Sequence, residues 1–361
     1  MSDKPRKELR RGWTTGACAT AALKAAYGAL LTSAFPDPVC IRLPRGQEPY
    51  FALASWELKD GSASASIIKD AGDDPDVTHL AEIRVRVRRL SPNSGIIFRA
   101  GPGVGTVTKP GLPISPGQAA INPVPRAMMR EVVEDIAKAN GAAPDAEVEI
   151  SIPGGEALAQ KTWNPRLGIV GGLSILGTTG IVVPFSCSAW IHSIHRGIDV
   201  ARANGLQHVA GCTGSTSEAA VRTLYDLPVT AMLDMGDFAG GLLKYFAKNP
   251  LPRLTIAGGF GKISKLAKGH MDLHSGRSQV DFNWLAERIG ELGGSDQLQD
   301  RVRKANTAKE VLDLALEEDL PLADSIAALA CQVAGRLLSS ETQLEVLIFD
   351  RNGAMVGSSN D

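Results

Sequence analysis

Four carboxylates lie close together in one short stretch of this 361-residue chain, at Asp70, Asp73, Asp74 and Asp76. Clustered acids can serve as general acid or base, ligate a metal ion or accept hydrogen bonds in a turn. Their spacing, D-x-x-D-D-x-D, differs from the D-x-D-x-D-G of a calcium-binding EF-hand loop. Spacing alone favours turn capping, with catalysis as the second interpretation.

Two histidine pairs have spacings that could place both rings on one helix face. They are His192 with His195, and His270 with His274. Neither pair has a third ligand nearby, so the case for a metal site is weak. We expect His270 and His274 to contact a ligand and His192 and His195 to be structural.

Glycine-rich loops follow three predicted strands, at residues 211–215, 234–237 and 258–262. In a parallel sheet such loops lie at the carboxyl edge, where ligands bind, and glycine allows close backbone approach. Asp234 directly follows a strand and could accept hydrogen bonds from a ribose diol. The alternative is that the glycines only make tight turns, because no GxGxxG follows a strand and no Walker motif occurs.

The first half of the chain mixes helix and strand patterns. The Ala-rich stretch 17–32 predicts a helix, which Thr14 or Thr15 would cap and whose N-terminal N–H groups would be free for an anion. Runs at 39–43 and 62–68 resemble strands, and residues 83–88 alternate strictly between apolar residues and arginine. We interpret these arginines as a solvated sheet face, with a docking surface for a polycarboxylate as the alternative.

Residues 101–126 are unusual, since 11 of these 26 residues are Gly or Pro. Such a segment is neither regular helix nor central strand, yet it is too apolar for a solvated linker, and long loops of this kind are often functional. A helix is predicted over 126–139 and a strand over 148–152.

From about residue 165, helix and strand patterns alternate. Helices are predicted at 187–203, 216–226 and 238–247, with three more in 281–338. Strands are predicted at 206–210, 229–233, 253–257 and 344–349. Alternation with short connections favours an open, mostly parallel sheet. We therefore predict a mixed α+β domain over 1–165 and a Rossmann-like α/β domain over 166–361.

Composition excludes several classes of protein. The 38 basic and 39 acidic residues give a net charge of −1, and only 5% of residues are aromatic, which argues against nucleic-acid binding. No apolar run is long enough to span a membrane, and no apolar segment follows the basic residues near Met1, so we expect a cytoplasmic protein without a secretory signal. The five cysteines are scattered without a CxxC, which argues against disulfides and a protein-bound metal.

Several longer strings go beyond what spacing can explain. They are Gly12-Trp13-Thr14-Thr15-Gly16, residues 69–78, 103–112 and 120–126, Ile152-Pro153-Gly154-Gly155-Glu156, residues 164–172 and 177–182, and Gly269-His270 with His274-Ser275. In their order these strings resemble the signatures of the cobalt-precorrin-5B C1-methyltransferase family, the CbiD proteins, and the similarity extends over nearly the whole chain.

The resemblance implies transfer of a methyl group from S-adenosylmethionine to C1 of cobalt-precorrin-5B, giving cobalt-precorrin-6A in anaerobic cobalamin synthesis. A sulfonium methyl is a good electrophile, so the protein mainly has to align it with the ring carbon. No protein-bound metal is then needed, and cobalt belongs to the substrate. A homo-oligomer and transient contacts with other corrin-pathway enzymes are also compatible with this reading.

Residue type and position then suggest roles. Asp73 or Asp74 would act as general base or orient polar groups of the ring. Cations and polar residues would bind the carboxylates at the edge of the macrocycle. The residues predicted to form the cofactor pocket are Asp234 together with Gly171, Gly172, Gly177, Thr178, Thr179 and Gly180. The substrate-binding residues are Thr14, Thr15, Lys69, Lys109, Arg126, Arg166, His270 and His274.

Two other functions use the same features. A non-catalytic carrier or chaperone of corrinoid intermediates would bind the macrocycle without binding S-adenosylmethionine. A nicotinamide-dependent reductase fits a Rossmann-like half, but the absence of GxGxxG after a strand counts against it.

Overall fold

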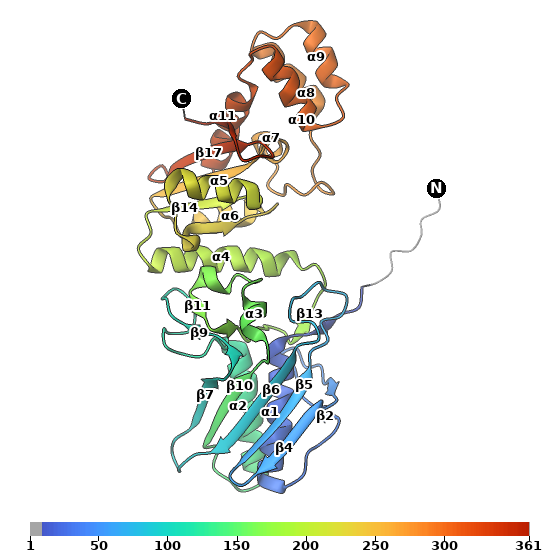
Figure 1. Cartoon of the computed structure of the whole chain (residues 1–361), viewed down its shortest axis with the longest axis vertical. Coiled ribbons are helices and arrows are strands. Elements are labelled where there is room, and N and C mark those ends of the chain that lie inside the picture. Colours follow the sequence, from blue (N-terminus) through green and yellow to red (C-terminus); the bar gives the residue numbers. More distant parts are fainter. Residues whose placement is uncertain (1–8, 361) are drawn as a thin grey trace, which may run out of the picture. The chain divides into compact units, whose positions relative to one another are not determined.

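The computed structural model describes residues 9–360 and divides into two compact units, one ending at Cys187 and the other starting at Ser188 (Figure 1). The predicted boundary at 165/166 differs from this division. Residues 169–182 lie in unit 1 because their short strands pair with strands from the first half of the chain. The basic residues before residue 9, on which the expected absence of a secretory signal depends, lie outside the described residues.

Unit 1 is built on a five-stranded sheet of mixed direction. Its strands are, in spatial order, β4 (Ser55–Lys59), β5 (Ser62–Ile68), β6 (Glu82–Arg89), β10 (Ala146–Ser151) and β7 (Ile96–Ala100). All neighbouring pairs are antiparallel except β10 and β7, which are parallel. Figure 1 shows two helices, α1 (Thr15–Thr32) and α2 (Pro123–Ala139), packed on this sheet.

Small residues explain how closely α1 packs. Seven of its 18 residues are alanine, and nearly every residue from Thr15 to Ala26 is buried. The helix therefore contacts β5, β6 and α2 at once. Ile83, Val85 and Val87 point from β6 into this core and are fully buried. Helix α2 begins at Pro123, a residue favoured in a first turn, three residues before the predicted start.

The arginines of β6 lie on the exposed face of the sheet, as predicted. Arg86 pairs with Glu149 at 3.1 Å, and Arg88 pairs with Glu147 at 2.8 Å across the neighbouring strand. Glu147 also contacts Arg99 of β7 at 3.2 Å. This face is therefore a set of cross-strand ion pairs, and its positive charge is largely balanced.

Short elements connect the rest of unit 1. The segment 101–122 is irregular, as predicted, apart from two two-residue strands. The short strands are β1 (Gly12–Trp13), β2 (Val39–Cys40), β3 (Tyr50–Phe51), β8 (Gly103–Val104), β9 (Thr106–Val107), β11 (Ile169–Val170), β12 (Gly172–Leu173) and β13 (Ile181–Val182). A helix α3 (Gly155–Ala159) and a 3₁₀ turn η1 (Asn164–Leu167) lie among them.

Unit 2 contains a second five-stranded sheet. Its strands are, in spatial order, β15 (Met232–Asp234), β14 (His208–Cys212), β16 (Arg253–Gly259), β17 (Gln343–Phe349) and β18 (Met355–Ser358). The first four run parallel and β18 is antiparallel. Ala210 and Cys212 face α5, whereas Gly211 faces Leu242 of α6, so helices cover both faces.

The helices of unit 2 match most of the predicted elements. The prediction of three helices in 281–338 is wrong, because four are present: the short polar helix α9 buries only Leu298 and Val302 and shows little apolar pattern. The bounds are α4 (Cys187–Ala203), α5 (Ser215–Tyr225), α6 (Ala239–Phe246), α7 (Phe260–Ala267), α8 (Phe282–Glu291), α9 (Asp296–Arg303), α10 (Ala308–Glu317), α11 (Leu322–Gly335) and a 3₁₀ turn η2 (Val229–Ala231).

Both units thus combine helices with a sheet of mixed strand direction, which confirms the prediction of a mixed α and β chain. Among the described residues, no helix has the length and apolar character required to cross a membrane.

Candidate functional site

The strings singled out in unit 1 come together at one end of its sheet. Strand β1 pairs with β13, β8 with β12, and β9 with β11, so residues near 12, 105 and 170–182 become neighbours. The close approach needs glycine: a Cβ on Gly103 would lie 1.9 Å from the carbonyl oxygen of Ile152. Backbone packing therefore explains much of the glycine content of these strings.

Thr14 holds the first turn of α1. Its side chain accepts a hydrogen bond from the Ala17 N–H at 3.2 Å, which confirms one of the two predicted caps. The Gly16 N–H donates to the carbonyl of Leu176 at 2.8 Å, and Thr15 is buried. The expectation of free N–H groups here is therefore wrong for Gly16 and Ala17, because a loop of the same unit and the cap use them.

The acidic stretch folds back onto the segment before β1. The Asp73 carboxylate accepts from the Arg10 N–H at 2.7 Å, and the Asp73 N–H donates to the Arg10 carbonyl at 2.9 Å. Asp74 accepts from the Phe185 N–H at 2.8 Å. Both carboxylates therefore cap backbone groups of distant segments, and not of their own turn as the first interpretation of their spacing predicts. A role in catalysis stays a prediction.

Two ion pairs hold this stretch. The buried ammonium of Lys69 contacts Asp76 and the Thr78 hydroxyl, and hydrogen bonds from Arg10 and the Gly72 N–H lower the pKa of Asp70 to about 2. Burial opposes ionisation of Asp76, but Lys69 and Thr78 outweigh it and lower its pKa. The Lys69 side chain is only 3% exposed, so its binding of substrate stays a prediction that would require this pair to open.

The loop 171–180 fits tightly around its neighbours. A Cβ on Gly172 would meet the Gly103 backbone at 2.3 Å, and one on Gly180 would meet Leu43 at 2.5 Å, whereas Gly171 faces open space. Thr179 hydrogen-bonds with the backbone of Ile181. Gly177 lies against Thr14, and Thr178 is exposed. Binding of a cofactor by this loop stays a prediction.

Besides Lys69, three predicted cations lie in unit 1. The Lys109 stem covers Gly168, next to the turn that carries Arg166, whose guanidinium lies 5.5 Å from the Trp163 ring centre. Arg126 lies on α2 and donates to the carbonyls of Ile121 and Ala119 at 2.8 and 3.0 Å. Lys109 and Arg166 are therefore brought near one loop, and Arg126 is held at the start of α2.

Asp234 lies in unit 2, at the carboxyl end of β15. The next two strands of the sheet, β14 and then β16, run parallel to β15, and the helices that follow them begin after Gly214 and Gly259, neither of which offers a side-chain cap. A Cβ on either glycine would meet nothing within 4 Å. The backbone at these two helix starts is therefore open to a ligand.

His270 and His274 lie in the irregular segment after α7. His274 Nδ1 accepts from the Gly276 N–H at 3.1 Å, and the neighbouring Leu273 N–H donates to the Asp237 carbonyl at 2.8 Å. This segment therefore packs beside the loop after β15. In α4, His195 stacks on Tyr245 with 4.0 Å between ring centres, in keeping with a structural role. Among residues 9–360, no group of three His, Cys, Asp or Glu side chains could hold a metal ion.

Comparison with known proteins gives consistent matches. The family model CbiD matches residues 2–184, and the model described as CbiD, C-terminal domain, matches residues 272–360. A solved structure described as cobalamin biosynthesis protein (cbiD) from Archaeoglobus fulgidus is 23% identical, with a TM-score of 0.39 over 86% of this chain and 84% of that one.

Three relatives are named cobalt-precorrin-5B C(1)-methyltransferase. The one from Paramagnetospirillum magneticum is 60% identical over 100% of both chains. The one from Brucella anthropi is 60% identical over 96% of this chain and 94% of its own, and that from Methylorubrum extorquens is 57% identical over 97% of each. On the strength of these matches, the chain belongs to the CbiD family.

Proposed function

We propose that this chain methylates C1 of cobalt-precorrin-5B, giving cobalt-precorrin-6A in anaerobic cobalamin synthesis. The observation that carries the proposal is identity of about 60% over the full length to a relative of that name. It favours the methyltransferase over the carrier, which would bind the macrocycle without modifying it.

S-adenosylmethionine is the proposed methyl donor, and it supplies a methyl group on a positively charged sulfur with a neutral thioether as leaving group. The open backbone at Gly214 and Gly259 fits such a ligand, since N–H groups at helix starts bind carboxylates. We also read the strand order β15-β14-β16-β17 as Rossmann-like, with its switch point between β14 and β16, where such folds bind ligands. Asp234 would accept hydrogen bonds from the ribose.

The loop 171–180 is the second candidate for the donor. Thr178 is its exposed polar side chain, and the turn at Gly171 is open. Titration calorimetry with S-adenosylmethionine separates the two candidates. Asp234→Asn should weaken binding if the donor lies at the strand ends of unit 2, and Thr178→Val should weaken it if the donor contacts the loop.

The macrocycle is proposed to bind at the end of the unit 1 sheet, where Lys109, Arg126 and Arg166 can meet its carboxylates. Thr14 and Thr15 lie at the start of α1 in the same region. Substrate binding by His270 and His274, which lie in unit 2, is a separate proposal. Asp73 or Asp74 would accept a proton or orient polar groups of the ring.

Purified protein with S-adenosylmethionine and cobalt-precorrin-5B tests the activity. Mass spectrometry should show a product with one added methyl group and formation of S-adenosylhomocysteine. Tight binding of the macrocycle without methylation would instead support the carrier.

Asparagine variants test the proposed base. Asp73→Asn and Asp74→Asn keep an oxygen that can accept the backbone N–H but remove the charge. The variant that lacks the base should lose about 100-fold or more in kcat at unchanged melting temperature. Asp135→Asn, on the exposed side of α2, is the control and should be fully active. Unaltered turnover in both Asp73 and Asp74 variants would remove the base role.

A cytoplasmic location, self-association and contacts with other enzymes of the pathway are also proposals. They rest on the family's biosynthetic role, and fractionation of cells and light scattering of the purified protein would test them.

A further inference from the structure

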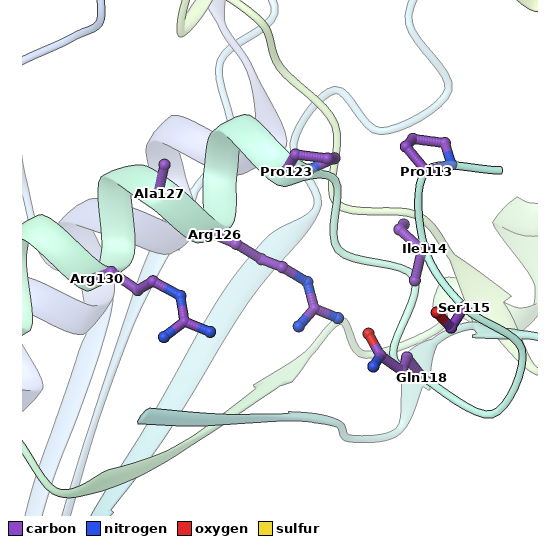
Figure 2. A pocket seen from close by; sticks show the side chains of 8 residues that line it. All are labelled: Pro113, Ile114, Ser115, Gln118, Pro123, Arg126, Ala127 and Arg130. Carbon is purple, nitrogen blue, oxygen red and sulfur yellow. The ribbon is translucent and has the colours of Figure 1, made fainter. Parts of the chain in front are cut away.

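Two arginines lie side by side on the first turns of α2. Arg126 and Arg130 are four residues apart, which places them on one face of the helix. Their guanidinium carbons lie 5.2 and 5.4 Å from the centre of the same Phe98 ring, on β7. Figure 2 shows both side chains extending from the same side of the helix.

No carboxylate in residues 9–360 forms an ion pair with either guanidinium. Burial and the charge of Arg130 both lower the pKa of Arg126. The contrast with Arg86 and Arg88 on the sheet face is informative, since each of those has a glutamate partner. Like charges placed together without a counterion repel each other, and a bound anion would relieve the repulsion.

Arg126 is also held in place, and both guanidinium groups lie over one aromatic ring. Nε and Nη2 of Arg126 donate to Ile121 and Ala119, and the aromatic ring supports both planar groups. Less conformational entropy is then lost when an anion binds.

A pocket of about 340 Å³ opens beside the pair. Its rim contains polar groups, from Ser115 and the Gln118 amide that lies beside Arg126 in Figure 2. The rest is apolar, from Pro113, Ile114, Pro123 and Ala127. The volume is at the low end of ligand pockets, about 300–1,000 Å³, so it suits part of a large ligand. An apolar wall and two cations at one side match an aliphatic arm that ends in a carboxylate.

We propose that this pocket binds a carboxylate-bearing side arm of the macrocycle, with Arg130 and Arg126 contacting the carboxylate and Phe98 positioning them. The assignment adds Arg130 and Phe98 to the substrate-binding residues. It rests on the proposed function for the identity of the ligand. Because the carboxylate does not react, the pocket should bind it equally in the ground state and in the transition state, so its loss should change KM and not kcat.

The test uses Arg130→Gln, which leaves the backbone contacts of Arg126 intact. The control, Lys138→Gln, removes the same charge from an exposed position in the last turn of the same helix. Binding of uroporphyrin, a macrocycle with carboxylate arms, is measured by fluorescence quenching, and methyl transfer by steady-state kinetics. Melting temperatures show that both variants fold.

Loss of a charge-assisted contact should weaken uroporphyrin binding by Arg130→Gln about tenfold or more, and raise KM for the corrinoid similarly at unchanged kcat. Lys138→Gln should match the unsubstituted protein. Unchanged binding and KM in Arg130→Gln, with methyl transfer intact, would overturn the pocket and leave the proposed function standing. Weakened uroporphyrin binding in a protein that transfers no methyl group would support the pocket and overturn the function.

Discussion

The side chain of Thr14 lies directly against Gly177, where an added Cβ would come within 2.3 Å of Thr14 Oγ1. The same hydroxyl caps α1, and the Thr14 N–H donates to the Gly180 carbonyl at 3.0 Å. The start of the first helix and a loop more than 160 residues later therefore form one structural unit. A substitution at Gly177 should therefore disturb the hydrogen bond by which Thr14 caps α1.

Gly177→Ala should destabilise unit 1 by about 2 kcal/mol, from strain at its positive φ and displacement of the cap. Gly61→Ala is the matched control, because Gly61 also has a positive φ but open space around it, and should cost about 1 kcal/mol. Urea unfolding measures both. Equal losses in the two variants would show that the contact with Thr14 contributes nothing.

Asp76→Asn should lower the free energy of unfolding by about 3 kcal/mol, because it leaves the buried charge of Lys69 without its partner. Replacing both residues, as Lys69→Met with Asp76→Asn, should restore part of the loss. Thermal unfolding of the single and double variants tests this. A single variant as stable as the unsubstituted protein would show that the pair is open in solution and that Lys69 is available for substrate.

Acid should remove the contribution of Asp70 to stability. Its pKa is about 2 in the folded chain against an ordinary value of 3.8, so between these values the unfolded chain binds more protons. The contribution is present above about pH 4 and lost as the pH falls towards 2. Asp70→Asn should therefore melt at a lower temperature than the unsubstituted protein at pH 6, with the difference shrinking below pH 4. A difference independent of pH would contradict the charge-based account.

Glu345→Gln should destabilise unit 2 by about 2 kcal/mol, since hydrogen bonds to a buried charge are strong. The buried carboxylate accepts from the Tyr225 hydroxyl at 2.6 Å, from Thr255 at 2.9 Å and from Arg253 at 3.2 Å. Tyr225→Phe removes a single donor and should cost about 1 kcal/mol. Denaturant midpoints compare the two, and a larger loss in Tyr225→Phe would mean that ring packing dominates.

Elements with a local pattern could be predicted from the sequence. The strand 62–68 and the helix 187–203 have the predicted limits, because alternation and helical periodicity are visible within each segment. Two-residue strands such as β1 and β13 have too few residues for any period. They exist because distant segments pair. The same pairing explains why residues 166–187 belong to unit 1 and not, as predicted, to the second domain.

The candidate site was predictable in part for the same reason. The acidic stretch and the signature glycines could be named, and the structure brings Thr14, Asp73 and the loop 171–180 to one end of unit 1. Arg130 was missed, although its spacing from Arg126 was a readable signal. Its meaning depends on the ring of Phe98, which comes from a strand on the other side of a long irregular segment.

The pairing of β1 with β13 has a consequence for synthesis of the chain. Residues 12–13 leave the ribosome early, yet their partners at 181–182 emerge only when unit 1 is almost complete. The five-stranded sheet of unit 1 can form while the rest of the chain is still being synthesised, because domains generally fold as units, the N-terminal one first. The end of unit 1 that carries the candidate site is then its last part to assemble. A nascent chain stopped before residue 176 would lack the carbonyl of Leu176, so the Gly16 N–H in the first turn of α1 would have no partner from that loop.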